Sequence, residues 1–239
     1  MLPWLPENVS TYGDRLDAIF YLILWITGII FVLVQVTLLV FAVKYRHREG
    51  RRAHHIHGNW KVEAVWTAIP FLIVVMLGIV SVGPWLDIRD PRRFPSDALE
   101  LAVVAKQFEW NVTYPGADGV LGTDDDFVRR NQLHFPAHRP VVVHLSAEDV
   151  IHSFFLPEFR VKQDAVPGMH IPVWFEATRA GEFTLGCAEL CGSGHTRMRG
   201  SVTVYAGMEE FDAWQRGMAP GVAAAPEPDG TGSGRAGAH

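Results

Sequence analysis

Four side chains that bind soft metal ions stand within twelve residues near the end of the chain: Cys187, Cys191, His195 and Met198. Two thiolates, an imidazole and a thioether favour copper over calcium, magnesium or manganese. The alternation in residues 181–185 predicts a strand just before them, so the ligands would lie on the loop that leaves this strand. Glycines 192 and 194 allow a loop tight enough for the four side chains to face one point. This stretch predicts a metal site.

The number of thiols separates this site from mononuclear blue copper, which uses one cysteine. Two nearby cysteines can instead both bridge a pair of copper ions, leaving one histidine and one weaker ligand for each ion. That arrangement needs a second histidine, and His152 is the best candidate because apolar neighbours would keep its pocket dry. The alternative is a disulfide between Cys187 and Cys191, which an exported domain would permit. The histidine and methionine that follow favour copper.

The order of these residues resembles that of a known family. An H-S-F stretch, then C-x-E-x-C, then G-H-x-x-M is similar to the binuclear CuA centre of cytochrome c oxidase subunit II. The resemblance covers residues 18 to about 206 and implies a cupredoxin domain behind two membrane helices. It also implies a copper ligand set of five side chains and the backbone carbonyl of Glu189: His152, Cys187, Glu189, Cys191, His195 and Met198. The Glu189 side chain would point towards a magnesium or manganese site shared with subunit I.

Two apolar runs near the start predict a transmembrane hairpin over residues 18–83, after a polar outer segment of residues 1–17. The first run, residues 18–43, would reach about 39 Å as a helix, more than the roughly 30 Å of a bilayer core and too uniformly apolar for a buried core helix. The second, residues 62–82, contains Pro70, which should kink it. The loop 44–61 carries six basic residues against one acidic residue, a net charge of +5. By the positive-inside rule this loop is cytoplasmic, which places the large domain outside a bacterial plasma membrane.

Beyond the hairpin we expect a linker at residues 84–97, a β domain at 98–217 and a disordered tail at 218–239, which is rich in Ala, Pro and Gly. The predicted strands are 98–107, 131–135, 141–146, 168–177, 182–186 and 200–206, and a helix at 208–216 closes the domain. His152 and the cysteine loop fall at strand ends. This pattern suits an all-β Greek-key sandwich that holds a metal at one pole.

Ionisable residues elsewhere leave alternatives open. Glu63 begins a stretch, residues 63–70, that resembles the family's second-helix motif, whose glutamate lies at the mouth of a proton-uptake channel. Without the resemblance, a carboxylate lying harmlessly among the lipid head groups is an equal interpretation. The acidic turn from Asp118 to Asp126 has some oxygen-ligand character for calcium but lacks the full spacing, so a solvated hairpin is favoured. The histidines at 54, 55 and 57 suit a hydrated loop better than a metal site.

The charge and aromatic residues of the large domain bear on its partners. Residues 96–239 carry 11 basic against 19 acidic residues, a net charge of −8. We therefore expect no nucleic-acid partner for this domain, and a basic cytochrome c would be steered to it. The family's surface patch has two tryptophans flanking a tyrosine, whereas residues 107–110 here keep only Trp110, with Phe108 at the first position. Electrons would arrive through Trp110, or from a haem c domain held in a fixed complex.

The resemblance implies that this chain is subunit II of a haem-copper cytochrome c oxidase. Its dinuclear copper would accept electrons from cytochrome c and pass them to haem in subunit I, where oxygen is reduced to water. Two other classes fit less of the sequence. A membrane-anchored copper-delivery protein explains the ligands but neither the Glu63 motif nor a second membrane helix, and a thiol–disulfide exchange protein explains only the cysteines.

Overall fold

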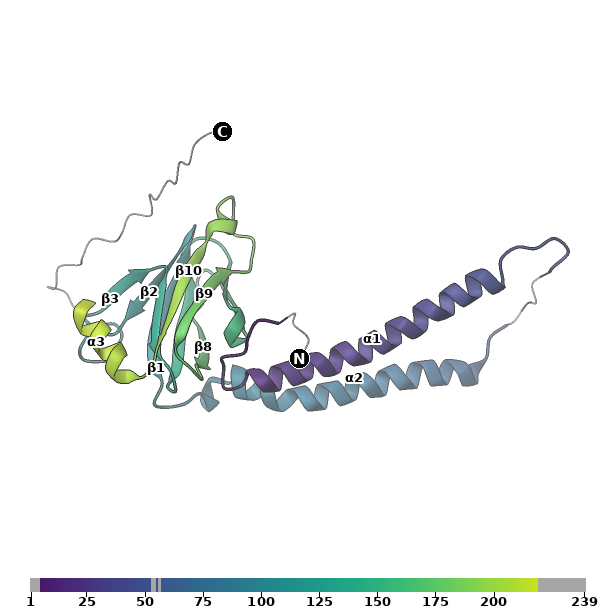
Figure 1. Cartoon of the computed structure of the whole chain (residues 1–239), viewed down its shortest axis with the longest axis horizontal. Coiled ribbons are helices and arrows are strands. Elements are labelled where there is room, and N and C mark those ends of the chain that lie inside the picture. Colours follow the sequence, from purple (N-terminus) through teal and green to yellow (C-terminus); the bar gives the residue numbers. More distant parts are fainter. Residues whose placement is uncertain (1–4, 53–54, 56, 219–239) are drawn as a thin grey trace, which may run out of the picture.

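Two long helices run side by side and project from one side of a β domain (Figure 1). The computed structural model describes residues 5–52, 55 and 57–218, so the predicted tail beyond 218 and His54 lie outside the described residues. Helices α1 (Gly13–Lys44) and α2 (Trp60–Arg89) have apolar windows with mean hydropathy of 2.7 and 2.5, and none of those residues is buried. By length and composition, both helices can cross a membrane.

Helix α2 extends beyond its predicted end, through both Pro70 and Pro84. Residues 84–89 are therefore helical, and the prediction that they belong to a linker is wrong. Contacts with the β domain support these last turns, where carbonyl groups lack partners within the helix. The indole N–H of Trp174 donates to the backbone oxygen of Asp87 at 3.0 Å, and Arg89 donates to the backbone oxygen of Lys162 at 3.2 Å.

The β domain is a sandwich of two five-stranded sheets, with strand orders β3-β2-β1-β5-β8 and β4-β10-β9-β6-β7. The pairs β1·β5 and β10·β4 are parallel, and the other pairs are antiparallel. The strands are β1 (Leu99–Lys106), β2 (Glu109–Tyr114), β3 (Phe127–Arg130), β4 (Gln132–Pro136), β5 (Pro140–Ala147), β6 (His152–Leu156), β7 (Val161–Ala165), β8 (Ile171–Glu176), β9 (Gly181–Cys187) and β10 (Arg199–Tyr205). The predicted all-β sandwich behind two apolar helices is confirmed.

The core lies between the two sheets. Alternate residues of β1 and β2 are buried, as expected for strands with one face inward. Large aromatic side chains fill the centre, including the fully buried Trp110, Phe135, Phe154 and Phe175. Helix α3 (Met208–Met218) covers the side of the sandwich away from the membrane hairpin (Figure 1).

Candidate metal centre

The predicted ligands meet where two neighbouring strands end. Strand β9 ends at Cys187, and β6, which begins at His152, pairs with it antiparallel so that Phe154 lies opposite Cys187. The amide of Ala188 donates to the backbone oxygen of Ser153 at 3.0 Å, which ties the start of the loop to β6. Sheet pairing therefore brings the His152 imidazole beside Cys187, which lies 35 residues further along the chain.

The donor atoms form a compact group. The Sγ atoms of Cys187 and Cys191 are 3.8 Å apart. His152 Nδ1 lies 4.0 Å from the first sulfur, and His195 Nδ1 lies 3.7 Å from the second. Met198 Sδ is 3.8 Å from Cys191 Sγ, and the backbone oxygen of Glu189 is 3.2 Å from Cys187 Sγ. The two sulfur atoms thus lie between two imidazoles, with a thioether and a carbonyl beside them.

This geometry separates the interpretations that the sequence left open. Both cysteines are free, and a sulfur separation of 3.8 Å is far beyond the roughly 2.05 Å of a disulfide bond. Two thiolates and two imidazoles would also suit one tetrahedral zinc ion, which takes four ligands. Six donors exceed that number. A pair of soft ions that shared the two sulfur atoms would use all six, and copper is an ion that such donors suit.

The environment of the thiols favours a metal ligand over a redox-active disulfide. Cys191 is 4% exposed, and burial raises the pKa of its thiol to about 11, with neighbouring Cys187 contributing. Thiols that exchange disulfides have a lowered pKa instead. A buried thiol of high pKa becomes a thiolate when a metal displaces its proton, so metal binding here would release protons.

A network that the sequence did not reveal orients His152. The Nε2 of this fully buried histidine lies 2.9 Å from Oδ1 of Asp149, and the other carboxylate oxygen accepts the backbone N–H of Gln107 at 2.7 Å. Burial raises the pKa of Asp149, but the hydrogen bonds from His152 and from backbone amides outweigh it and leave the pKa below its usual value. Gln107 Nε2 donates to the backbone oxygen of Cys191 at 2.6 Å. The only sign of this network in the sequence is that Asp149 stands three residues before His152.

The two aromatic residues singled out by the sequence occupy different places. Phe108 is half-buried, and its ring lies so close to the loop that a Cβ on Gly194 would stand 2.3 Å from it. Trp110 is fully buried and packs edge-on against His152, with the ring centroids 6.2 Å apart. Phe108 therefore covers the loop from outside, whereas Trp110 supports a ligand from inside.

The other candidate residues lie apart from this group. Glu63 is exposed in the first turn of α2, where Asn59 caps the helix by accepting from the amides of Lys61 and Val62. The Glu189 side chain is exposed although its backbone oxygen faces the sulfur atoms. In the acidic turn, Asp118 accepts from the amide of Val120, and Asp125 and Asp126 accept from other donors of the same turn. These internal hydrogen bonds support the interpretation as a hairpin.

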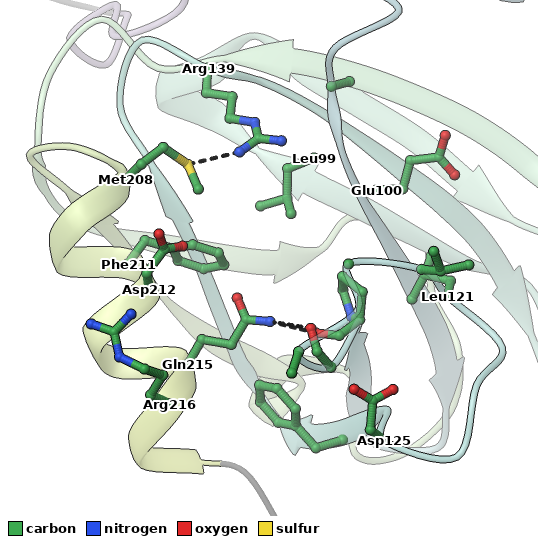
Figure 2. A pocket seen from close by; sticks show the side chains of 17 residues that line it. Leu99, Glu100, Leu121, Asp125, Arg139, Met208, Phe211, Asp212, Gln215 and Arg216 are labelled. Carbon is green, nitrogen blue, oxygen red and sulfur yellow. Dashed lines mark hydrogen bonds between the residues drawn. The ribbon is translucent and has the colours of Figure 1, made fainter.

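A cavity of about 800 Å³ lies between α3, the start of β1 and the loop from β2 to β3 (Figure 2). Arg139 reaches the sulfur atom of Met208 on one side, and Gln215 donates to the backbone oxygens of Pro115 and Gly116 on another. None of the predicted ligands lines this cavity. This cavity is therefore separate from the candidate metal centre.

A β-sandwich with a loop of thiols and an imidazole, attached to two membrane-length helices, defines a membrane-anchored cupredoxin-like protein. Comparison with known proteins agrees. The model of the transmembrane domain of cytochrome c oxidase subunit II matches residues 4–83, and the model of its periplasmic domain matches residues 103–204. The chain belongs to the cytochrome c oxidase subunit II family, as its motifs predicted.

Individual relatives span most of the chain. The alternative cytochrome c oxidase subunit 2 of Bradyrhizobium diazoefficiens is 32% identical over 237 residues, covering 89% of this chain and 83% of the relative. Cytochrome c oxidase subunit 2 of Thermostichus vulcanus is 34% identical over 265 residues, covering 89% and 77%. The crystal structure of the periplasmic domain of cytochrome oxidase subunit II of Bradyrhizobium japonicum aligns with a TM-score of 0.45 at 30% identity, covering 52% of this chain and 95% of that domain.

Proposed function

We propose that this chain carries the dinuclear copper centre at which a haem-copper oxidase receives electrons. The observation that carries the proposal is the pair of free cysteine sulfur atoms, 3.8 Å apart, with an imidazole nitrogen within 4.0 Å of each. When bound, such a centre supplies reversible one-electron chemistry. The electrons would come from cytochrome c, soluble or bound in a complex, and pass to haem in subunit I for the reduction of oxygen.

The residues of this chain would hold the ligands nearly fixed between redox states. His152 is anchored by Asp149 through its second ring nitrogen and enclosed by Trp110. Hydrogen bonds to the second nitrogen of a ligating histidine fix its orientation and tautomer. Gln107 restrains the backbone at Cys191, and Met198 is 1% exposed. A rigid, dry ligand set keeps the reorganisation that accompanies electron transfer small.

The surface over the loop favours electron arrival beside Phe108. A donor cannot touch the buried Trp110, whereas Phe108 lies over Gly194 on the loop that would hold the metal. The exposed apolar side chains of Ile151 (46%) and Leu190 (77%) add contact area on the two segments that carry ligands. We propose that the donor docks on this apolar face and that the net charge of −8 guides a basic donor towards the domain.

The remaining assignments rest on the family resemblance together with the position of each residue. The helices would cross the bacterial plasma membrane with the basic loop in the cytoplasm and the β domain on the outer side. Glu63, at the loop end of α2, would then stand at the cytoplasmic surface, where a carboxylate could take up protons. The exposed Glu189 side chain would contribute to a magnesium or manganese site shared with subunit I.

The proposal is tested on the purified full chain in detergent, loaded with copper after reduction of its thiols. We expect two copper ions per chain and the multiline EPR signal of one unpaired electron shared between two nuclei. Cys187→Ser and Cys191→Ser should each abolish the shared signal, because a hydroxyl cannot bridge copper in the same way. A four-line spectrum from one copper ion, or tight binding of a single zinc ion in its place, would refute the dinuclear assignment.

A further inference from the structure

A buried ion pair joins the first membrane helix to the β domain. Arg160 Nε donates to Asp17 Oδ1 at 2.7 Å, and its Nη2 donates to Asp17 Oδ2 at 3.0 Å. The same guanidinium donates to the backbone oxygens of Pro157 at 2.8 Å and Pro6 at 2.7 Å. The two side chains are only 11% and 7% exposed. We call these four hydrogen bonds the Arg160–Asp17 clamp.

The clamp stands where α1 meets the sandwich. Among the residues of α1, only Gly13 and Asp17 are buried, so its contact with the β domain is confined to its first two turns. Arg160 has a φ of 58°, a left-handed conformation that a residue with a Cβ adopts at some cost. This conformation ends the 3₁₀ turn at Pro157–Phe159, and the buried guanidinium that follows it meets one carboxylate.

The same turn connects to the metal centre through rigid structure. Strand β6 begins at His152, runs to Leu156 and continues through a 3₁₀ turn, Pro157–Phe159, into Arg160. Strand β7 returns antiparallel, with Val161 opposite Leu156 and Ala165 opposite His152. The clamp and His152 therefore stand at opposite ends of one paired hairpin, so a turn of the sandwich at the clamp would carry the candidate metal centre with it as a unit.

Other contacts also join the helices to the sandwich, among them the hydrogen bonds of α2 from Trp174 to Asp87 and from Arg89 to Lys162. The backbone of residues 9–11 bonds to residues 158 and 176–178, through Val9 to Glu158 and Thr178 and through Thr11 to Glu176. The Tyr12 hydroxyl donates to the backbone oxygen of Trp174 at 3.1 Å. Most of these contacts lie along one edge, the end of β8, about which the domain could turn. The clamp supplies a buried attachment away from that edge.

We propose that Arg160 is a positioning residue for electron transfer, because its clamp on Asp17 sets the orientation of the metal-bearing sandwich relative to the membrane helices. The inference rests on the proposed function, since orientation matters there through the distance from the metal centre to an acceptor in the membrane. An apolar pair of similar volume would often match a buried ion pair in stability. A bidentate pair is also directional, and direction is what a fixed transfer distance requires.

The test uses the assembled oxidase with Asp17→Asn, Arg160→Lys and the apolar double variant Asp17→Leu/Arg160→Met. The matched control is Glu7→Gln, which removes the exposed ion pair with Arg179 (2.6 Å, side chains 67% and 47% exposed) that joins the same N-terminal segment to the domain. Three quantities are measured: the EPR spectrum of the copper centre, its rate of reduction by the donor, and the rate of electron arrival at haem after photoinjection into the copper centre. Hydrogen exchange of the Val9 amide in the metal-free chain reports on the junction directly.

We expect each clamp variant to keep the copper spectrum and the rate of reduction by the donor, but to slow electron arrival at haem several-fold, because the rate of electron transfer falls steeply with the distance between the two centres. Val9 exchange should be faster in these variants and unchanged in Glu7→Gln. A rate of arrival within twofold of wild type in the apolar double variant would overturn the positioning role. So would failure of all three clamp variants to assemble, because the pair would then serve folding alone. Absence of the dinuclear signal in the wild type would instead refute the proposed function.

Discussion

Acidification should destabilise the β domain through His134. This histidine of β4 is 9% exposed, its Nε2 has no hydrogen-bond partner among the described residues, and its ring stacks on Trp214 of α3 at a centroid distance of 4.2 Å. Its Nδ1 lies 3.2 Å from the Tyr205 hydroxyl. Burial, with a smaller contribution from Arg129, lowers the pKa of His134 from 6.5 to about 4. The folded chain therefore keeps this imidazole neutral at a pH where the unfolded chain protonates it.

The sign and size of the effect follow from linkage. Between pH 6.5 and about 4 the unfolded state binds more protons than the folded state, so the free energy of unfolding decreases as the pH falls. With these two pKa values, His134 lowers the free energy of unfolding by about 2 kcal/mol between pH 7 and pH 5. The loss stops growing below about pH 4, where the folded state is protonated too.

His134→Phe keeps the stacked ring and removes the titration. The free energy of unfolding of the full chain in detergent is measured with denaturant from pH 7 to pH 4. Between pH 7 and pH 5 it should fall by about 2 kcal/mol more in the wild type than in the variant. His138→Asn, a change at an exposed histidine with φ of 58°, is the control and should follow the wild type. Equal slopes for wild type and His134→Phe would refute the reasoning. They would mean that cation–π attraction to Trp214 offsets the loss of hydration.

Three further predictions concern the metal centre and the membrane hairpin. Gly194→Ala should destabilise the loop by about 1–3 kcal/mol in thermal unfolding, because the new Cβ would lie 2.3 Å from the Phe108 ring. Adding Phe108→Ala to the same chain should restore most of this loss, and a failure to do so would show that the clash lies elsewhere. Asp149→Asn should weaken copper retention against a chelator by about 10–100-fold, whereas Glu148→Gln, an exposed neighbour, should not. Glu63→Ala should slow turnover of the assembled oxidase while leaving reduction of the copper centre by the donor unchanged, and unaltered turnover across pH would contradict its role in proton uptake.

The loop was predictable because its chemistry is local. Five of the six proposed ligand positions lie within twelve residues, so their spacing alone indicated a soft metal site. The helices were predictable for a similar reason, since long apolar runs need no tertiary contacts to be recognised. Six of the ten strands were also expected. The strands that were missed, β2, β3, β6 and β7, are only four to six residues long, which leaves few alternating positions by which to recognise them.

Missing β2 had a consequence for Trp110. On this strand Trp110, Val112 and Tyr114 alternate with less buried residues, so all three point into the core. The resemblance to the family's surface patch implied that Trp110 could receive electrons at the surface. The strand period instead places it behind His152, and its neighbour Phe108, in the turn before β2, takes the outer position. How each aromatic faces the loop depends on the strand, and residue spacing within a motif does not reveal it.

Long-range polar contacts lie furthest from what a sequence pattern can show. Arg160 and Asp17 are 143 positions apart, and neither belongs to a recognisable motif. The ligands define what the loop can bind, but electron transfer also needs a fixed distance to an acceptor that this chain does not contain. That distance is set where the sandwich meets the helices. Most of the proposed ligands can therefore be predicted from twelve residues of sequence. The orientation of the sandwich depends on contacts that only the folded chain brings together.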